Sequence, residues 1–133
     1  MAIKRIIMGA ALVLFGLLVF FLQSRVSAET QTVNSFLEAL SDSDFDAAFL
    51  MLSKDGQAFF GNSDAFRSDY LSRYPIPNEW DISTIPDNND DGFYAGKLTD
   101  QNGKEFRWRI EPRRDLGRNE PVYINRYRFF AIE

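Results

Sequence analysis

The sequence predicts an α+β protein in which an N-terminal transmembrane helix is followed by helices packed on a curved antiparallel sheet of about four strands. Two observations carry this prediction. Apolar residues recur with the helical period up to about residue 74, and from residue 79 onward they recur with the period of two that strands show. Helices followed by a run of strands are typical of α+β domains, and 133 residues suffice for one small domain. We therefore expect an anchor over 1–28 and one domain over 29–133.

The first 28 residues indicate a membrane anchor. Lys4 and Arg5 precede an unbroken apolar run of 17 residues, 6–22, which is about 25 Å of helix at 1.5 Å per residue. The run is at the short end of a membrane span and is longer than the core of a typical signal peptide. The alternative is a signal peptide that is cleaved after Ala28, because Val26 and Ala28 are small residues.

The charges around the anchor predict its orientation. Lys4 and Arg5 lie before the apolar run, and only Arg25 lies close after it. Positive residues stay on the cytoplasmic side, so the rest of the chain is expected outside. In a bacterium this means the inner (cytoplasmic) membrane, with the C-terminal domain periplasmic or extracellular. Gly9 and Gly16 lie on nearly the same side of the helix, where another helix can approach, although glycine is also simply frequent in membrane helices.

Three helices are expected after the anchor. No Gly or Pro separates residues 22 and 40, so the anchor either continues into the first helix or breaks near residues 27–30. The apolar residues of that first helix are Val33, Phe36, Leu37 and Leu40. A capping box of Ser43 and Asp46 predicts the start of the second helix, whose apolar residues are Phe45, Ala48, Phe49 and Leu52.

A loop is expected between Gly56 and Gly61, and a third helix after it. Asn62 or Ser63 caps this helix, and Pro75 and Pro77 end it. Phe66, Tyr70 and Tyr74 fall on one of its faces.

Strands follow from Glu79 onward. The expected strands are residues 79–84, 93–99, 106–110 and 122–132, with a turn at 86–92 and a polar loop at 112–121. The pair Asn102-Gly103 is a hairpin signal between the second and third strands.

The segment FLEALSDSDFDAAFLMLS, residues 36–53, resembles the opening of the nuclear transport factor 2-like superfamily. Many bacterial members begin with an apolar helix, a short acidic turn and an Asp-aromatic-x-Ala-Ala helix that ends in Leu-Ser. The resemblance implies a cone in which a concave sheet and helices enclose a pocket. That cone serves isomerases, dehydratases and binding modules, so the fold by itself does not fix a function.

The sequence disfavours two kinds of chemistry, calcium binding and acid–base catalysis. The turn 87–92 matches half of a calcium loop, but Leu98 stands where the twelfth-position glutamate is needed. The superfamily's enzymes use Asp, His and Tyr, and this chain has no histidine and no cysteine. The remaining acid–base candidates are Asp69, Tyr70, Tyr74, Asp81 and Tyr94, in no spacing that implies a mutual hydrogen bond. We expect no cofactor, no metal site and no catalysis.

Partner binding is the better expectation, with two candidate surfaces in the domain. Phe59 and Phe60 either plug the open end of the cone or insert into a partner or the bilayer interface. Residues 101–133 hold 8 basic and 5 acidic side chains, whereas residues 29–100 hold 4 and 14. If Tyr123, Tyr127 and Phe129 join the core, strand alternation places four arginines on the outer surface of the sheet, namely Arg107, Arg109, Arg126 and Arg128.

The arginines have two possible counterparts. Internal acids such as Glu105 and Glu111 pair with them, or an acidic partner surface or anionic lipid does. Nucleic acid is not expected, because residues 29–133 are acidic overall. The sequence thus predicts a single-pass, non-catalytic accessory or scaffold subunit of a larger membrane assembly, whose partners are the bilayer and other membrane subunits. The alternatives are an anchored domain that binds a small ligand and an isomerase- or dehydratase-like enzyme.

Overall fold

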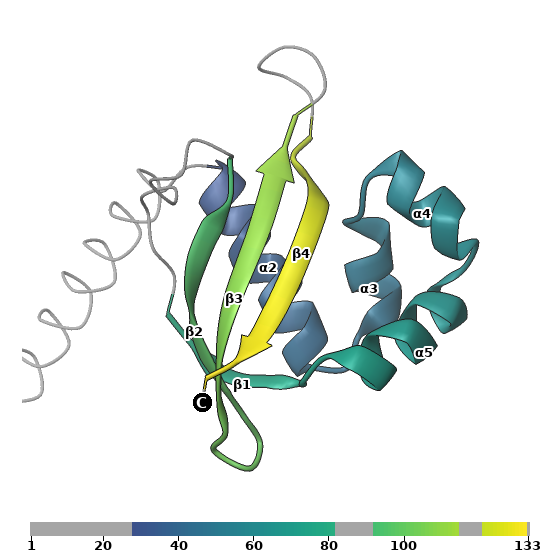
Figure 1. Ribbon diagram of the computed structural model, residues 1–133. Coiled ribbons are helices and arrows are strands. Elements are labelled where there is room, and N and C mark those ends of the chain that lie inside the picture. Colours follow the sequence, from purple (N-terminus) through teal and green to yellow (C-terminus); the bar gives the residue numbers. More distant parts are fainter. Residues whose placement is uncertain (1–27, 82–91, 115–120, 133) are drawn as a thin grey trace, which may run out of the picture.

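The computed structural model describes residues 28–81, 92–114 and 121–132, and within them it is an α+β protein. Helix α2 lies across one face of a four-stranded sheet, and three shorter helices lie beyond the last strand (Figure 1). The helices are α2 (Ala28–Ser41), α3 (Phe45–Leu50), α4 (Lys54–Phe60) and α5 (Ser63–Arg73). The strands are β1 (Pro77–Trp80), β2 (Tyr94–Asp100), β3 (Glu105–Arg113) and β4 (Tyr123–Ala131).

Several sequence predictions lie outside the described residues. The anchor is one of them, because residues 1–27, which include Gly9 and Gly16, are not described. Another is the calcium-like turn, of which only Gly92 is described. Among the residues that the structure describes, no helix is both long enough and apolar enough to cross a membrane.

The sheet is the antiparallel meander that the sequence predicts. Its strands are ordered β1-β2-β3-β4, and each pairs with the next. At the β2–β3 hairpin Gly103 has a φ of 79°, which glycine adopts without strain. The Asp100 carboxylate accepts hydrogen bonds from the backbone N–H groups of Asn102 and Lys104, both at 2.9 Å. The Asn-Gly signal is therefore confirmed.

Helix α2 forms the core with the inner face of the sheet. Its predicted apolar residues are buried, and so are Trp108 and Ile110 on β3. The Trp80 indole donates to Asn34 Oδ1 at 3.0 Å and so links β1 to α2. Gly96 allows the close approach of Trp108, since a Cβ atom there would lie 2.6 Å from the indole ring. Glycine is thus needed for the packing of this core.

The predicted capping residue of α3 is wrong by one position. The N-cap is Asp44, whose Oδ1 accepts a hydrogen bond from Ala47 N at 3.1 Å. Ser43 instead occupies the preceding turn with a φ of 56°. The helix ends at Leu50, and Leu52 makes a parallel β-bridge with Ile124 instead of continuing the helix.

The expected loop between Gly56 and Gly61 is helix α4. Ser53 caps it by accepting a hydrogen bond from Gly56 N at 3.0 Å. Gly61 ends it with a φ of 84°, and its N–H donates to Gln57 O at 2.8 Å. Two glycines that read as loop markers are therefore one helical residue and one C-cap.

Helix α5 joins the short helices to β4 through aromatic rings. Asn62 is its N-cap, as one of the two predicted alternatives had it. Phe66 and Tyr70 are fully buried. The Tyr70 ring lies 5.8 Å from Phe129, and the Tyr74 ring lies 5.2 Å from it. These contacts hold α5 beside β4.

The start of β1 and the end of β3 differ from the prediction by more than one residue. β1 begins at Pro77, which is compatible with an edge strand because no ladder hydrogen bond is needed from its nitrogen. β3 runs on to Arg113, with a register shift between Glu111 and Pro112. This shift puts Ile124 into the core, whereas Tyr123, which was expected there, lies outside the core cluster.

Candidate functional site

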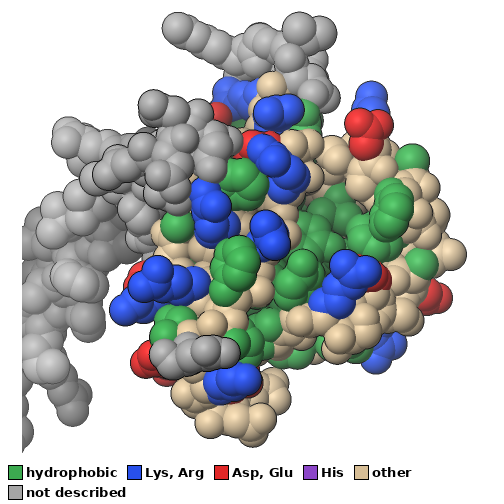
Figure 2. All heavy atoms as spheres, viewed as in Figure 1, with side chains coloured by type: hydrophobic (Ala, Val, Ile, Leu, Met, Phe, Trp, Pro, Cys, Tyr) green, Lys and Arg blue, Asp and Glu red, His purple; other side chains and the backbone are tan. Residues whose placement is uncertain are grey.

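The outer face of the sheet carries the four predicted arginines. Arg109 lies directly opposite Arg128, Arg107 is opposite Phe130, and Arg126 is opposite Glu111. Directly opposed residues of an antiparallel pair share a face, so all four side chains rise from the same side. Figure 2 shows basic side chains gathered over this side of the sheet, away from α2. Their placement is as the alternation predicts, and their role in binding remains a prediction.

Phe93 relieves part of the repulsion between these like charges. The guanidinium carbons of Arg109 and Arg126 each lie 4.7 Å from the centroid of its ring. An aromatic face attracts a cation electrostatically, so one ring holds two arginines in place. Phe93 is itself buried in this arrangement, at 7% exposure.

Glu111 supplies the acidic counterpart on the same face. It is 2% exposed, and its Oε2 accepts a hydrogen bond from Arg126 Nη2 at 2.8 Å. Arg113 Nη2 lies 3.7 Å from the other carboxylate oxygen, Glu111 Oε1, and the Asn125 amide donates a hydrogen bond to that same oxygen. The Arg126 hydrogen bond lowers the pKa of Glu111 below its usual value; burial opposes this shift, and Asn125 and Arg113 support it.

Internal pairing covers only part of the arginine-rich face. Arg107 and Arg128 form no ion pair with any described residue, and both are exposed. The Arg128 guanidinium lies 5.1 Å from the ring of Phe130, whose side chain is 38% exposed. Glu105, expected as a counterion, likewise makes no ion pair within the described part of the chain. Two cations therefore stay available to solvent or to a partner.

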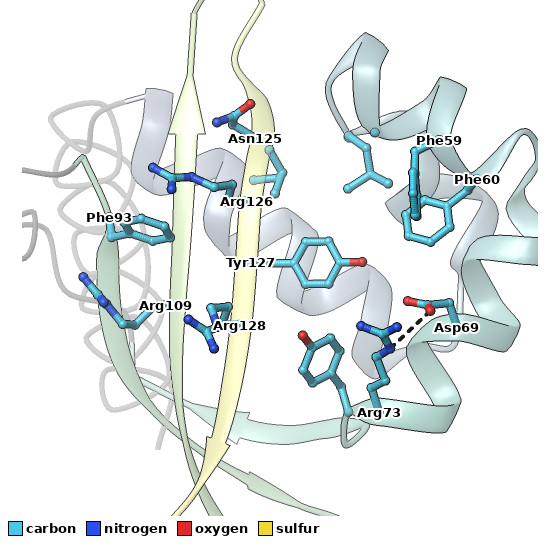
Figure 3. Close-up of a pocket in the computed structure, with 14 residues that line it drawn as sticks. Phe59, Phe60, Asp69, Arg73, Phe93, Arg109, Asn125, Arg126, Tyr127 and Arg128 are labelled. Carbon is cyan, nitrogen blue, oxygen red and sulfur yellow. Dashed lines mark ion pairs between the residues drawn. The ribbon is translucent and has the colours of Figure 1, made fainter.

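A groove borders this face on the side of β4. It has a volume of about 620 Å³ and lies between β4 and the helices α4 and α5 (Figure 3). Residues 124–128 form one wall, and Arg126 and Arg128 bring the arginine-rich face to its rim. Asp69, Arg73 and Tyr74 of the α5 side form the other wall, where Arg73 Nε and Asp69 Oδ1 are 3.3 Å apart.

The two phenylalanines of α4 lie at this groove with different burial. Phe60 packs on Phe66, with ring centroids 5.3 Å apart. Phe59 stacks edge-on against Phe60 but is 82% exposed. Phe60 therefore packs against α5, whereas the side chain of Phe59 is open to solvent and does not plug the fold. Figure 3 shows both side chains on the helical wall, facing β4 across the groove.

The acid–base candidates are largely separated. Asp69 and Tyr74 line the groove, whereas Tyr94 is buried in the sheet and Asp81 is exposed beyond β1. The Tyr70 hydroxyl donates to Pro75 O at 2.5 Å, and burial raises the pKa of Tyr70. In the described ranges no cluster of acidic residues could hold a metal ion. Trp108, Tyr70 and Phe36 fill the space between helices and sheet, so the hollow lies beside β4 and not inside a cone.

Sequence reasoning missed the groove and two of its residues. Tyr127 was assigned to the core, yet it projects from β4 into the groove as well (Figure 3). Burial raises the pKa of its hydroxyl, and the nearby Asp69 carboxylate adds to the effect. Arg73 has one local signal, its i,i+4 spacing from Asp69. The groove has none, because elements distant in sequence form it.

No family model, no curated protein and no solved structure matches the chain. The resemblance of residues 36–53 to the nuclear transport factor 2-like superfamily therefore stays a prediction. What the structure shows is an α+β fold.

Proposed function

We propose that this chain is a single-pass, membrane-anchored accessory or scaffold subunit whose extracytoplasmic domain docks on an acidic surface of a partner protein. The observation that carries the proposal is the arginine-rich face, where Arg107 and Arg128 have no ion pair with a described residue. Exposed cations concentrated on one face raise the rate and the specificity of association with an acidic surface.

The charge distribution of the domain supports this choice. Residues 29–133 are acidic overall, but their basic residues gather in the final third. Such a charge asymmetry makes the electrostatic potential of one face more positive than that of the rest, and it orients the domain as it approaches an acidic surface. The apolar run of residues 6–22 would hold that face close to the bilayer, where other membrane subunits present their extracytoplasmic parts.

The proposal includes the inner membrane of a bacterium, an N-terminus in the cytoplasm and a non-catalytic role. The flanking Lys4 and Arg5 support the orientation. Fold resemblance supports a non-catalytic binding module only by analogy.

Charge reversal tests the proposal. The full-length chain is extracted in mild detergent with its partners after cross-linking in the cell. Arg107→Glu with Arg128→Glu should reduce the recovery of partners about fivefold or more at low salt. Arg67→Glu, a reversal on the remote exposed face of α5, should leave recovery unchanged.

Folding must be checked in parallel by thermal melting of the purified variants. Both arginines are exposed and neither is ion-paired with Glu111, whose partners are Arg113 and Arg126, so the melting temperature should change little. If the chain migrates alone after extraction, or if the double variant recovers its partners fully, the subunit proposal fails.

A second candidate is the binding of a small ligand in the groove. The volume of about 620 Å³ supports it, because small-molecule pockets usually occupy roughly 300–1,000 Å³ and combine apolar walls with a few polar groups. A small carboxylate that raises the melting temperature of the wild type, but not of Arg73→Gln, would favour this candidate.

A further inference from the structure

The edge of β4 that faces the groove has unpaired backbone groups. Ile132 N donates to Glu105 O at 3.1 Å, which makes these two residues a hydrogen-bonded pair of the β3–β4 ladder. Hydrogen-bonded and non-hydrogen-bonded pairs alternate along an antiparallel ladder. Arg128 and Arg126 therefore direct their peptide groups toward β3, and Tyr127 and Phe129 direct theirs away from it. Within the described residues β4 is the last strand of the sheet.

One position of this edge is already paired, by an isolated parallel β-bridge. Ile124 N donates to Met51 O at 2.7 Å, and Ser53 N donates to Ile124 O at 3.0 Å. The parallel bridge between Leu52 and Ile124 ends there, because the chain turns at Ser53 into α4. The groove begins at the same place and follows β4 from Ile124 to Arg128. A strand in the groove would continue the pairing that Leu52 begins.

We infer that this groove binds an extended, acidic segment of the partner protein, which adds to β4 as a further strand. The inference rests on the proposed docking function and specifies which part of the partner binds and through which groups. Strand addition satisfies the backbone groups of Tyr127 and Phe129, and alternate side chains of the added strand then face opposite sides.

The two sides of the added strand meet different surroundings. On the outer side its side chains lie next to Arg126 and Arg128, so acidic residues are favoured there. On the inner side they lie next to Tyr127 and Phe60, where apolar residues are favoured. The site therefore selects a segment in which acidic and apolar residues alternate.

The same charges argue against a second copy of this chain as the occupant. Two β4 strands paired edge to edge would bring Arg126 and Arg128 of both copies onto one face, and like charges on neighbouring strands are destabilising. Anionic lipid supplies the charge but has no peptide groups to pair with the edge. An acidic strand satisfies both requirements.

Synthetic peptides test the inference on the full-length chain in non-ionic detergent. The probe is a fluorescent seven-residue peptide of alternating valine and glutamate, followed by anisotropy. N-methylation of every second residue, on the edge that pairs, should weaken binding at least about tenfold, because each pairing donor is lost. A valine–lysine peptide should bind at least about tenfold more weakly than the glutamate peptide.

Two matched variants place the peptide. Arg128→Glu, at the rim of the groove, should weaken binding of the glutamate peptide about fivefold or more. Lys97→Glu lies on the same face, opposite Arg107, but does not line the groove, and it should change binding less than about twofold. Bound peptide should also slow hydrogen exchange at the Tyr127 and Phe129 amides, a readout that a merely electrostatic contact does not give.

The outcomes separate this inference from the docking proposal. Equal binding of the N-methylated peptide, or unchanged exchange at Tyr127, overturns strand addition. Equal effects of Lys97→Glu and Arg128→Glu, with competition by anionic phosphatidylglycerol vesicles, overturn it in favour of lipid. If no peptide binds while the double reversal still abolishes partner recovery, strand addition falls and docking stands. If partner recovery is also insensitive to the reversals, docking falls too.

Discussion

At the scale of single residues, Glu111 is the carboxylate whose negative charge offsets part of the repulsion within the arginine-rich face. Alternation along β3 places it beside Arg109 on a surface that the sequence alone would leave to solvent. Its 2% exposure comes from the register shift beside it, which brings Asn125 and Arg126 over the side chain. The four arginines could be predicted from periodicity, whereas the burial of Glu111 could not, because a bulge is not encoded in alternation.

Glu111 should make stability fall at acidic pH. Its folded pKa lies below the usual value of 4.5, so its contribution is present above pH 4.5 and is lost as the pH falls through the folded pKa. Glu111→Gln should reduce the unfolding free energy by about 1–3 kcal/mol at pH 7, because Arg126 loses a charged acceptor. Urea unfolding at pH 7, 5, 4 and 3 measures both effects.

Glu105→Gln is the control for this prediction. Glu105 lies on the same strand and is exposed without an ion pair to a described residue, so this change should alter stability by less than about 0.5 kcal/mol. A wild type and a Glu111→Gln variant with parallel pH profiles between pH 5 and 3 would contradict the assignment.

At the scale of elements, helix ends account for most differences between the expected and the observed structure. Phe59 and Phe60 read as loop residues because Gly56 and Gly61 flank them. The signals for α4 were present in Ser53 as a cap and Gly61 as a stop, but seven residues show too little periodicity to separate a helix from a loop. Longer elements such as α2 and β3 were predictable because several apolar residues repeat in each.

The cap of α3 gives a prediction at this scale. Asp44→Ala should lower the unfolding free energy by about 1 kcal/mol, since the Ala47 N–H loses its acceptor. Asp44→Asn should retain most of the stability, because asparagine caps about as well as aspartate. Thermal melts of both variants and of Ser43→Ala decide the position of the cap: a loss at Ser43→Ala with none at Asp44→Ala would restore the capping box at Ser43.

At the scale of the whole molecule, a tyrosine-rich junction connects the helices to the sheet. Four aromatic rings contact one another in every combination, with centroids 5.2–6.4 Å apart: those of Tyr70, Tyr74, Tyr127 and Phe129. The periodicity predicted which face of its helix or strand each residue occupies, but it did not predict that α5 lies beyond β4. That placement follows from packing across three elements, and the groove follows from the placement. The candidate binding site was thus predictable in its arginines and not in its shape.

This junction should make the fold sensitive to alkali. Burial raises the pKa values of Tyr70 and Tyr127 above the usual 10.0. Their contribution is fully present below pH 10 and declines as the unfolded chain loses its protons above that pH, by up to about 1.4 kcal/mol per group per pH unit. Tyr127→Phe should flatten the fall in unfolding free energy between pH 9 and 11, measured by urea titration.

A matched change at the second buried tyrosine repeats the test. Burial also raises the pKa of Tyr70, so Tyr70→Phe should flatten the alkaline slope as well. An identical slope for Tyr127→Phe and the wild type would show that Tyr127 ionises as freely in the folded chain as in the unfolded one.

The two tryptophans turn the unequal burial of β1 and β3 into an optical signal. Trp108 has no exposed surface, whereas Trp80 is half-buried and tied to Asn34 of α2. Acrylamide should therefore quench one emission component readily and spare a blue-shifted second one, giving a downward-curving Stern–Volmer plot. Replacing Trp80 with Phe should leave only the shielded component. The accessible component would then report the separation of α2 from β1, so opening at this seam could be followed without an added label.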